Sequence, residues 1–131
     1  MNLLLDTQVF LWWATAPEKL SGAALTACQD RTNALILSVV SVWEIQIKLQ
    51  LGKLKIASSI ERLVENQVQV NRVQVLPVLL PHVYGLAALP SHHKDPFDRL
   101  LIAQASLEGL TIVTSDAAFD AYEVTVLDAR V

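Results

Sequence analysis

Short apolar runs alternate with helical patterns from one end of the chain to the other, and this alternation limits the possible folds more than any other feature. Each run has the length of a buried strand. The runs span residues 2–5, 34–38, 73–78, 110–114 and 124–127. Strands separated by helices form a parallel sheet that the helices cover on both faces. The sequence therefore predicts a single α/β domain over residues 1–131, with three α/β/α layers and a mainly parallel central sheet.

Capping residues indicate where the predicted helices begin. Ser41 and Ser58 each precede a glutamate by three residues, which is the spacing of a capping box. Asp95 and Pro96 match an N-cap followed by a first helical residue. We expect helices over residues 7–14, 22–29, 42–51, 59–69, 81–89 and 96–108, and a helical turn over 117–122.

The composition excludes several classes of protein. With 131 residues, 53% of them hydrophobic, the chain is long enough to bury a core without a disulfide or a structural metal. No stretch approaches the roughly 20 apolar residues of a membrane-spanning helix, and residues 1–16 lack the basic start of a signal peptide. The formal charge of −3 excludes binding to nucleic acid through bulk positive charge. Cys28 is the one cysteine, which fits a cytoplasmic protein without disulfides.

Four acidic residues are predicted to meet at one edge of the sheet. Asp6 and Asp116 each follow an apolar strand, and Glu44 and Asp98 each lie in the first turn of a predicted helix. In an open parallel sheet, the carboxyl ends of the strands and the helix starts that follow them face the same edge. Taken alone, each acid also has a structural explanation, as a helix cap or as a charge that complements the helix dipole.

A cluster of carboxylates requires a proton or a cation. Two carboxylates about 5 Å apart repel by roughly 3 kcal/mol at an effective dielectric constant of about 20. An all-oxygen ligand set suits Mg²⁺ or Mn²⁺, and such a site hydrolyses phosphodiesters by activating water. Two other interpretations stay open: a non-catalytic module that binds a protein partner, and a phosphatase of haloacid-dehalogenase type. The phosphatase would need a second aspartate where this chain has Gln8.

The residues around these acids resemble a known family. The most specific run is HKDPFDRLLIAQA at residues 93–105, accompanied by LLDT at 4–7, SVWEI at 41–45 and IVTSD at 112–116. Over essentially the whole chain this pattern is similar to PIN domains, and among them to VapC-type toxins of bacterial toxin–antitoxin pairs. The resemblance implies a compact α/β/α fold and an Mg²⁺- or Mn²⁺-dependent endoribonuclease whose products carry a 5′-phosphate and a 3′-hydroxyl.

The same resemblance assigns roles to the acids. By position, Asp6, Glu44 and Asp98 match the three core acids of the family, and Asp116 matches a fourth, more variable one. We therefore expect all four to bind the metal and to take part in catalysis. Asp95, the first aspartate of the DPFD run, is interpreted as a helix cap. The resemblance further implies a cognate antitoxin protein and a homodimer, which could join a larger toxin–antitoxin assembly.

Residues beside the acids also have expected roles. Small hydroxyl side chains would orient carboxylates or a water molecule; they are Thr7, Thr114 and Ser115. Arg99 and Lys48 would contact RNA phosphate or neutralise the acids, and otherwise are solvated surface charges. His93 and Lys94 are further candidate RNA contacts, with a polar loop before the helix as the alternative. Adjacent tryptophans on one helix cannot both face the core, so an antitoxin or dimer surface is considered for Trp12, Trp13 and Trp43, although Trp43 is first expected in the core.

Overall fold

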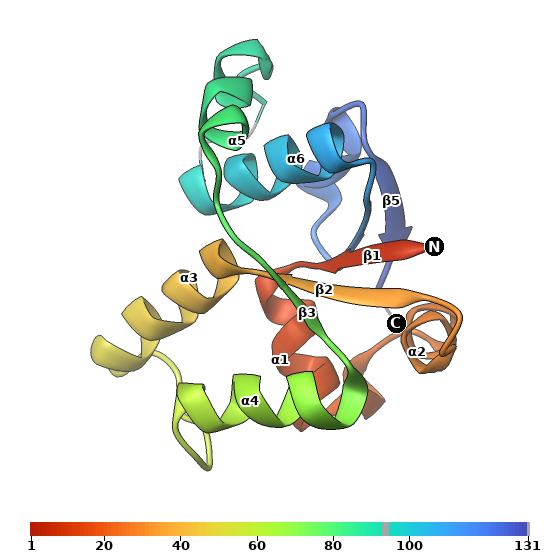
Figure 1. Ribbon diagram of the computed structural model, residues 1–131, viewed down its shortest axis with the longest axis vertical. Helices are drawn as coiled ribbons and strands as arrows, with labels where there is room; N and C mark the ends of the chain where they lie inside the picture. Colours follow the sequence, from red (N-terminus) through yellow and green to blue (C-terminus); the bar gives the residue numbers. More distant parts are fainter. Residues whose placement is uncertain (93–94, 131) are drawn as a thin grey trace.

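The computed structural model describes residues 1–92 and 95–130 and contains a five-stranded sheet (Figure 1). The strands are β1 (Asn2–Leu5), β2 (Ala34–Ser38), β3 (Gln74–Leu76), β4 (Thr111–Thr114) and β5 (Thr125–Asp128). They lie in the order β3-β2-β1-β4-β5, and every neighbouring pair is parallel. The predicted parallel sheet is therefore confirmed.

Helices cover both faces of this sheet. The α-helices are α1 (Thr7–Thr15), α2 (Gly22–Gln29), α3 (Val39–Gln50), α4 (Ile60–Asn71), α5 (Leu80–Gly85) and α6 (Pro96–Glu108). The described residues also form the short 3₁₀ helices η1 (Pro17–Lys19), η2 (Leu86–Ala88) and η3 (Ala117–Ala121). Helices α1, α2 and α4 lie on one side of the sheet, and α6 lies on the other with α5 against it (Figure 1). The predicted three-layer α/β/α arrangement is confirmed.

The central strand β1 contributes to both layers of the core. Leu3 and Leu5 pack with Phe10 of α1 in one apolar cluster, whereas Leu4 packs with Leu101 of α6 in the other. Successive side chains of a strand point to opposite faces, so a strand covered on both faces must be apolar at every position. This two-sided burial explains the continuous apolar runs of the sequence.

Two helices begin at serines other than the predicted ones. Ser38, the last residue of β2, accepts a hydrogen bond from the N–H of Val40 (3.1 Å) and caps α3, so the predicted cap Ser41 lies inside the helix. Helix α4 is capped by Ser59, not Ser58, through the N–H of Arg62 (3.2 Å). In both places a second serine lies within three residues of the predicted cap, and a spacing rule alone does not separate them.

The largest other differences from the prediction concern β3 and the helix expected over 81–89. Strand β3 is shorter than residues 73–78, because α4 continues to Asn71 and Pro77 cannot donate to a sheet. The helix predicted over 81–89 is divided into α5 and η2, whereas α6 has the predicted bounds and ends before Gly109, whose φ of +67° favours glycine. Among the described residues, no helix is both long enough and apolar enough to cross a membrane.

The order of the strands reverses between β1 and β4. The chain passes from β1 outward to β2 and β3, and then returns to the other side of β1 to form β4 and β5. Leu5 is paired with Val113, and the N–H of Asp6 donates to the carbonyl oxygen of Val113 at 3.0 Å. Open parallel sheets bind their ligands beyond the carboxyl ends of the strands at such a point, and this is where Asp6 lies.

Candidate active site

Asp6 is the most buried of the four predicted site acids. Asp6 is 6% exposed; it directly follows β1 and caps α1. One carboxylate oxygen, Oδ1, accepts a hydrogen bond from the N–H of Val9 at 2.7 Å, and Oδ2 accepts one from the hydroxyl of Thr114. Both oxygens therefore have a donor, and the carboxylate is fixed in orientation.

Glu44 lies in the second turn of α3, because that helix begins three residues earlier than predicted. Its Oε1 accepts a hydrogen bond from the hydroxyl of Thr7 at 2.8 Å, and the same hydroxyl lies 3.0 Å from the buried Oγ of Ser41. The other oxygen, Oε2, lies 3.0 Å from the ammonium nitrogen of Lys48. A neutral donor from α1 and a cation from α3 thus hold the half-buried carboxylate from two sides.

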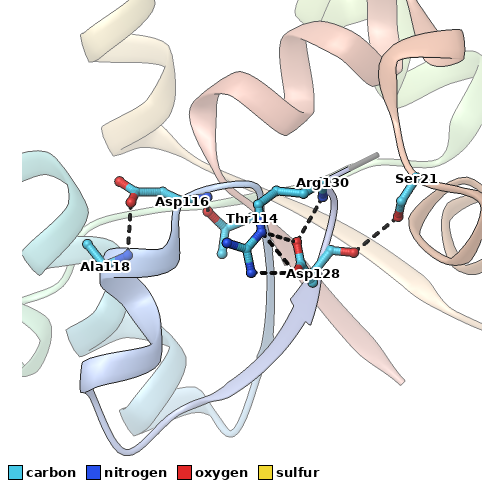
Figure 2. Close-up of polar contacts among 6 residues, drawn as sticks. All are labelled: Ser21, Thr114, Asp116, Ala118, Asp128 and Arg130. Atoms are coloured by element: carbon cyan, nitrogen blue, oxygen red, sulfur yellow. Dashed lines mark hydrogen bonds and ion pairs between the residues drawn. The ribbon is translucent and has the colours of Figure 1, made fainter.

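Asp116 is linked to Asp6 through Thr114. The hydroxyl of Thr114 donates to Asp6 and accepts a hydrogen bond from the N–H of Asp116 at 3.0 Å. Figure 2 shows the Asp116 carboxylate directed toward Ala118, whose N–H it accepts at 2.9 Å as the cap of η3. Asp116 is therefore a helix cap, one of the two roles that the sequence left open, and it is linked to the buried acid; its role as a metal ligand stays a prediction.

Asp98 lies half-buried in the first turn of α6. Asp95 caps this helix, as predicted, because its Oδ1 accepts the N–H groups of Phe97 (2.8 Å) and Asp98 (3.3 Å). The ring of Phe97 contacts the ring of Trp43 with centroids 4.9 Å apart. Since these aromatic residues are the chain neighbours of Asp98 and Glu44, the contact places α6 and α3 side by side at the same edge of the sheet.

Burial raises the pKa of Asp6 from 3.8 to about 6. The hydrogen bonds from Thr114 and Val9 oppose this rise, and the negative charges of Glu44 and Asp116 add to it. Glu44 and Asp116 are thus close enough to act on Asp6 electrostatically. A proton or a cation at this point would relieve the repulsion.

The acids do not form a complete chelating group in their present positions. Within residues 1–92 and 95–130, no three His, Cys, Asp or Glu side chains lie close enough together to hold a metal ion. Their donor chemistry nevertheless fits a hard divalent cation, because carboxylate oxygens are the ligands that Mg²⁺ and Mn²⁺ prefer. That the four acids share one ion stays a prediction.

Comparison with known proteins identifies the family. The model of the PIN domain matches residues 3–124. This chain belongs to the PIN domain family. A relative of this PIN domain, Ribonuclease VapC22 from Mycobacterium tuberculosis, is 32% identical over 121 residues, which cover 88% of this chain and 87% of the relative. The resemblance stated from the motifs is thereby confirmed.

Solved structures share the fold of this PIN domain. VapBC2 from Rickettsia felis, bound to a DNA fragment from its promoter, matches with a TM-score of 0.73 and 14% identity over 98% of this chain and 99% of that one. DNA-bound VapBC from Salmonella typhimurium matches with a TM-score of 0.70 and 14% identity, over 98% of each chain. At such identities the likeness shows the fold alone, and it confirms the predicted PIN-like architecture.

The cations beside the acids of this PIN domain differ in their surroundings. The guanidinium of Arg99 donates to the carbonyl oxygens of Pro90 (2.8 Å) and Leu86 (3.3 Å), and so fastens the segment that precedes α6. Lys48 is half-exposed in its pair with Glu44. The other two predicted RNA contacts lie outside the described residues; they are His93 and Lys94. Contact of any of the four with RNA stays a prediction.

The tryptophans of this PIN domain lie in three different surroundings. Trp12 and Trp13 are both partly buried against the core; Trp12 lines a groove beside residues 54–57, and Trp13 lines a separate cavity. Trp43 is 57% exposed, so the expectation that it belongs to the core is wrong. The buried positions of α3 are Val40, Ser41 and Ile45, and the exposed Trp43 contacts the ring of Phe97.

Sequence analysis missed two features of the site's surroundings. Gln104 of α6 is fully buried and accepts a hydrogen bond from Ser38. The sequence indicates this position only by a polar residue within the apolar run LLIAQA. Arg130 forms an ion pair with Asp128 at the carboxyl end of β5 (2.6 Å), where the Asp128 carbonyl also accepts the hydroxyl of Ser21 (Figure 2). No local pattern distinguishes that pair from ordinary charges near the end of a chain.

Proposed function

We propose that this PIN domain is a divalent-metal-dependent endoribonuclease that acts in the cytoplasm as the toxin of a toxin–antitoxin pair. The observation that carries the proposal is the Asp6 carboxylate, buried where the strand order reverses and acted on by the charges of Glu44 and Asp116. A buried acid with acidic neighbours costs several kcal/mol unless a cation or proton accompanies it. The relative from Mycobacterium tuberculosis is named a ribonuclease, which supports RNA as the substrate.

The proposed chemistry assigns a role to each group on this edge. The four acids, Asp6, Glu44, Asp98 and Asp116, would hold Mg²⁺ or Mn²⁺. Bound there, the ion would supply activation of a water molecule and stabilisation of the leaving oxygen, leaving a 5′-phosphate and a 3′-hydroxyl. The hydroxyl of Thr7 would orient Glu44, and that of Thr114 would orient Asp6. Ser115, half-buried between Thr114 and Asp116, would take the same kind of role.

Two surfaces support the proposal of protein partners. Structures of similar fold are complexes named VapBC, and large exposed apolar patches are uncommon on proteins that stay monomeric. We expect an antitoxin segment in the groove that Trp12 lines with residues 54–57. We expect a second copy of the chain on the apolar surface of α5 and the end of α6, which exposes Leu79, Leu80, Val83, Tyr84 and Leu107.

Cleavage of RNA by the purified chain tests the function directly. We expect single-stranded RNA to be cut in the presence of Mg²⁺ or Mn²⁺, the cutting to stop with a chelator, and added Mn²⁺ to restore it. The new ends should carry a 5′-phosphate, detected by ligation to an adaptor that requires that group. Undiminished cleavage in chelator, or 2′,3′-cyclic phosphate ends, would contradict a metal-activated water as the nucleophile.

The role of Thr7 gives a second, smaller effect. Thr7→Val removes the hydroxyl that holds Glu44 with little change of shape, so we expect RNA cleavage to fall about 10- to 100-fold, the usual effect of losing a group that orients a metal ligand. The Mn²⁺ concentration for half-maximal activity should rise as well. Thr7→Ser keeps the hydroxyl and should stay near wild type, and Thr26→Val on the exposed side of α2 is the matched control. Equal activity of the valine and serine variants at position 7 would contradict this role.

A further inference from the structure

An exposed tryptophan, Trp43, contacts the partly buried ring of Phe97 near two of the site acids. Trp43 of α3 is 57% exposed and directly precedes Glu44, and Phe97 of α6 directly precedes Asp98. Their centroids are 4.9 Å apart and their planes meet at 78°, an edge-to-face contact. The pair therefore bridges the two helices that carry two of the four site acids.

The position of Trp43 is not explained by the core. Val40 and Ile45 of α3 are fully buried, whereas Trp43 as a residue is more than half exposed. Phe97 is partly buried against the apolar cluster of α6 and holds the indole through the ring contact. An aromatic side chain that is exposed to solvent and held by a neighbouring ring loses little conformational entropy when a base stacks on it.

The charge of the chain argues for a contact of this kind with RNA. The net charge is −3 and the site itself is acidic, so bulk electrostatic attraction cannot hold a polyanion here. Single-stranded nucleic acids are bound through stacking of bases on aromatic side chains, helped by a few local cations. Lys48, half-exposed on the same helix as Trp43 and paired with Glu44, is the cation nearest to it along α3.

We propose that Trp43, held by Phe97, stacks against a base of the RNA strand next to the phosphodiester bond that is cut at the acids. This inference rests on the proposed ribonuclease function and adds to it the surface that positions the substrate. Trp43 is in this view a binding residue and takes no part in the chemical step.

Steady-state cleavage of a short single-stranded RNA by the full chain, with saturating Mn²⁺, tests the proposal. Trp43→Ala is expected to raise KM about tenfold, within the range for loss of one stacked base, while kcat changes less than about threefold. Trp43→Phe should recover most of the loss, because a phenyl ring still stacks. Leu51→Ala is the matched control, since Leu51 is an apolar side chain of similar exposure at the far end of α3.

The outcomes separate this inference from the function on which it rests. Unchanged KM in Trp43→Ala, with metal-dependent cleavage intact, overturns the stacking role and leaves the ribonuclease in place; weaker binding of a protein partner by the same variant would then assign the rings to that partner. A fall in kcat alone that Trp43→Phe does not recover also overturns it, because the ring would then act by supporting Glu44. Absence of cleavage by the wild-type chain overturns both proposals.

Discussion

Asp6→Asn is expected to abolish RNA cleavage and, in the same protein, to raise the free energy of unfolding at neutral pH without metal. The loss of cleavage should be at least about a hundredfold, the scale on which removal of one preorganised electrostatic group acts in an active site. The fold should survive the change, because asparagine caps helices as well as aspartate does and Asp6 is the cap of α1.

The gain in stability follows from the raised pKa of Asp6. The carboxyl group has a pKa of about 6 in the folded chain against 3.8 for the unfolded reference. Between these values the folded state binds a proton that the unfolded state has lost, so the free energy of unfolding falls as pH rises from about 4 to 6. At higher pH the full difference applies, at most about 3 kcal/mol for a shift of this size. An uncharged asparagine avoids this loss. Its single oxygen still accepts the N–H of Val9, and the hydrogen bond from Thr114 that is given up offsets only part of the gain, about 1 kcal/mol.

Urea unfolding in the presence of a chelator, at pH 5 and pH 7.5, measures the effect. The wild type should lose stability between the two values, and Asp6→Asn should lose less and be the more stable protein at pH 7.5. Added Mn²⁺ should then stabilise the wild type more than the variant, because binding to the folded state stabilises it. Asp120→Asn, on the exposed surface of η3, is the control that should change neither property. Cleavage of RNA by Asp6→Asn at the wild-type rate would contradict the assignment of Asp6 to the active site.

The position of Asp6 could be predicted because it depends on patterns that a sequence displays. An acid at the end of a fully apolar strand must lie at a carboxyl edge of a parallel sheet, whatever the details of packing. The same reasoning placed Asp116 after β4, and the pairing of Leu5 with Val113 confirms that the two strand ends are neighbours. Strand periodicity and topology thus determine which side chains share an edge, but not the distances between their oxygen atoms.

Two of the incorrect predictions concern the cap of α3 and the burial of Trp43. Ser38 and Ser41 are both good caps, and Ser38 caps α3 because β2 leads into the helix without a loop. Trp43 was expected in the core because large aromatic residues usually are buried. On α3, however, smaller side chains occupy the inward positions. The indole instead contacts Phe97, which belongs to a helix far away in the sequence. Contacts between elements that are far apart in the sequence cannot be predicted from local periodicity.

Gln104→Ala is expected to destabilise the fold by about 3 to 5 kcal/mol, the sum of a cavity and of buried polar groups left without partners. The side chain has no exposed surface. Its Oε1 accepts the hydroxyl of Ser38 at 2.6 Å, and its Nε2 donates to the carbonyl oxygen of Pro77 at 3.2 Å and lies 3.4 Å from Nδ1 of the buried His82. One glutamine of α6 therefore ties together the ends of β2 and β3 and the start of α5.

The effect on the site should follow from the effect on α3. Ser38 caps that helix through the N–H of Val40, and the same helix carries Glu44, so a loosened Ser38 disturbs the carboxylate as well as the fold. Equilibrium urea unfolding measures the loss, with Gln46→Ala as control, since Gln46 is an exposed glutamine within α3 and the change of helix propensity is the same. Exposed substitutions of this kind usually stay within about 0.5 kcal/mol of the wild type. If Gln104→Ala unfolds within about 1 kcal/mol of that control, the buried network is not what joins α6 to the carboxyl edge of the sheet.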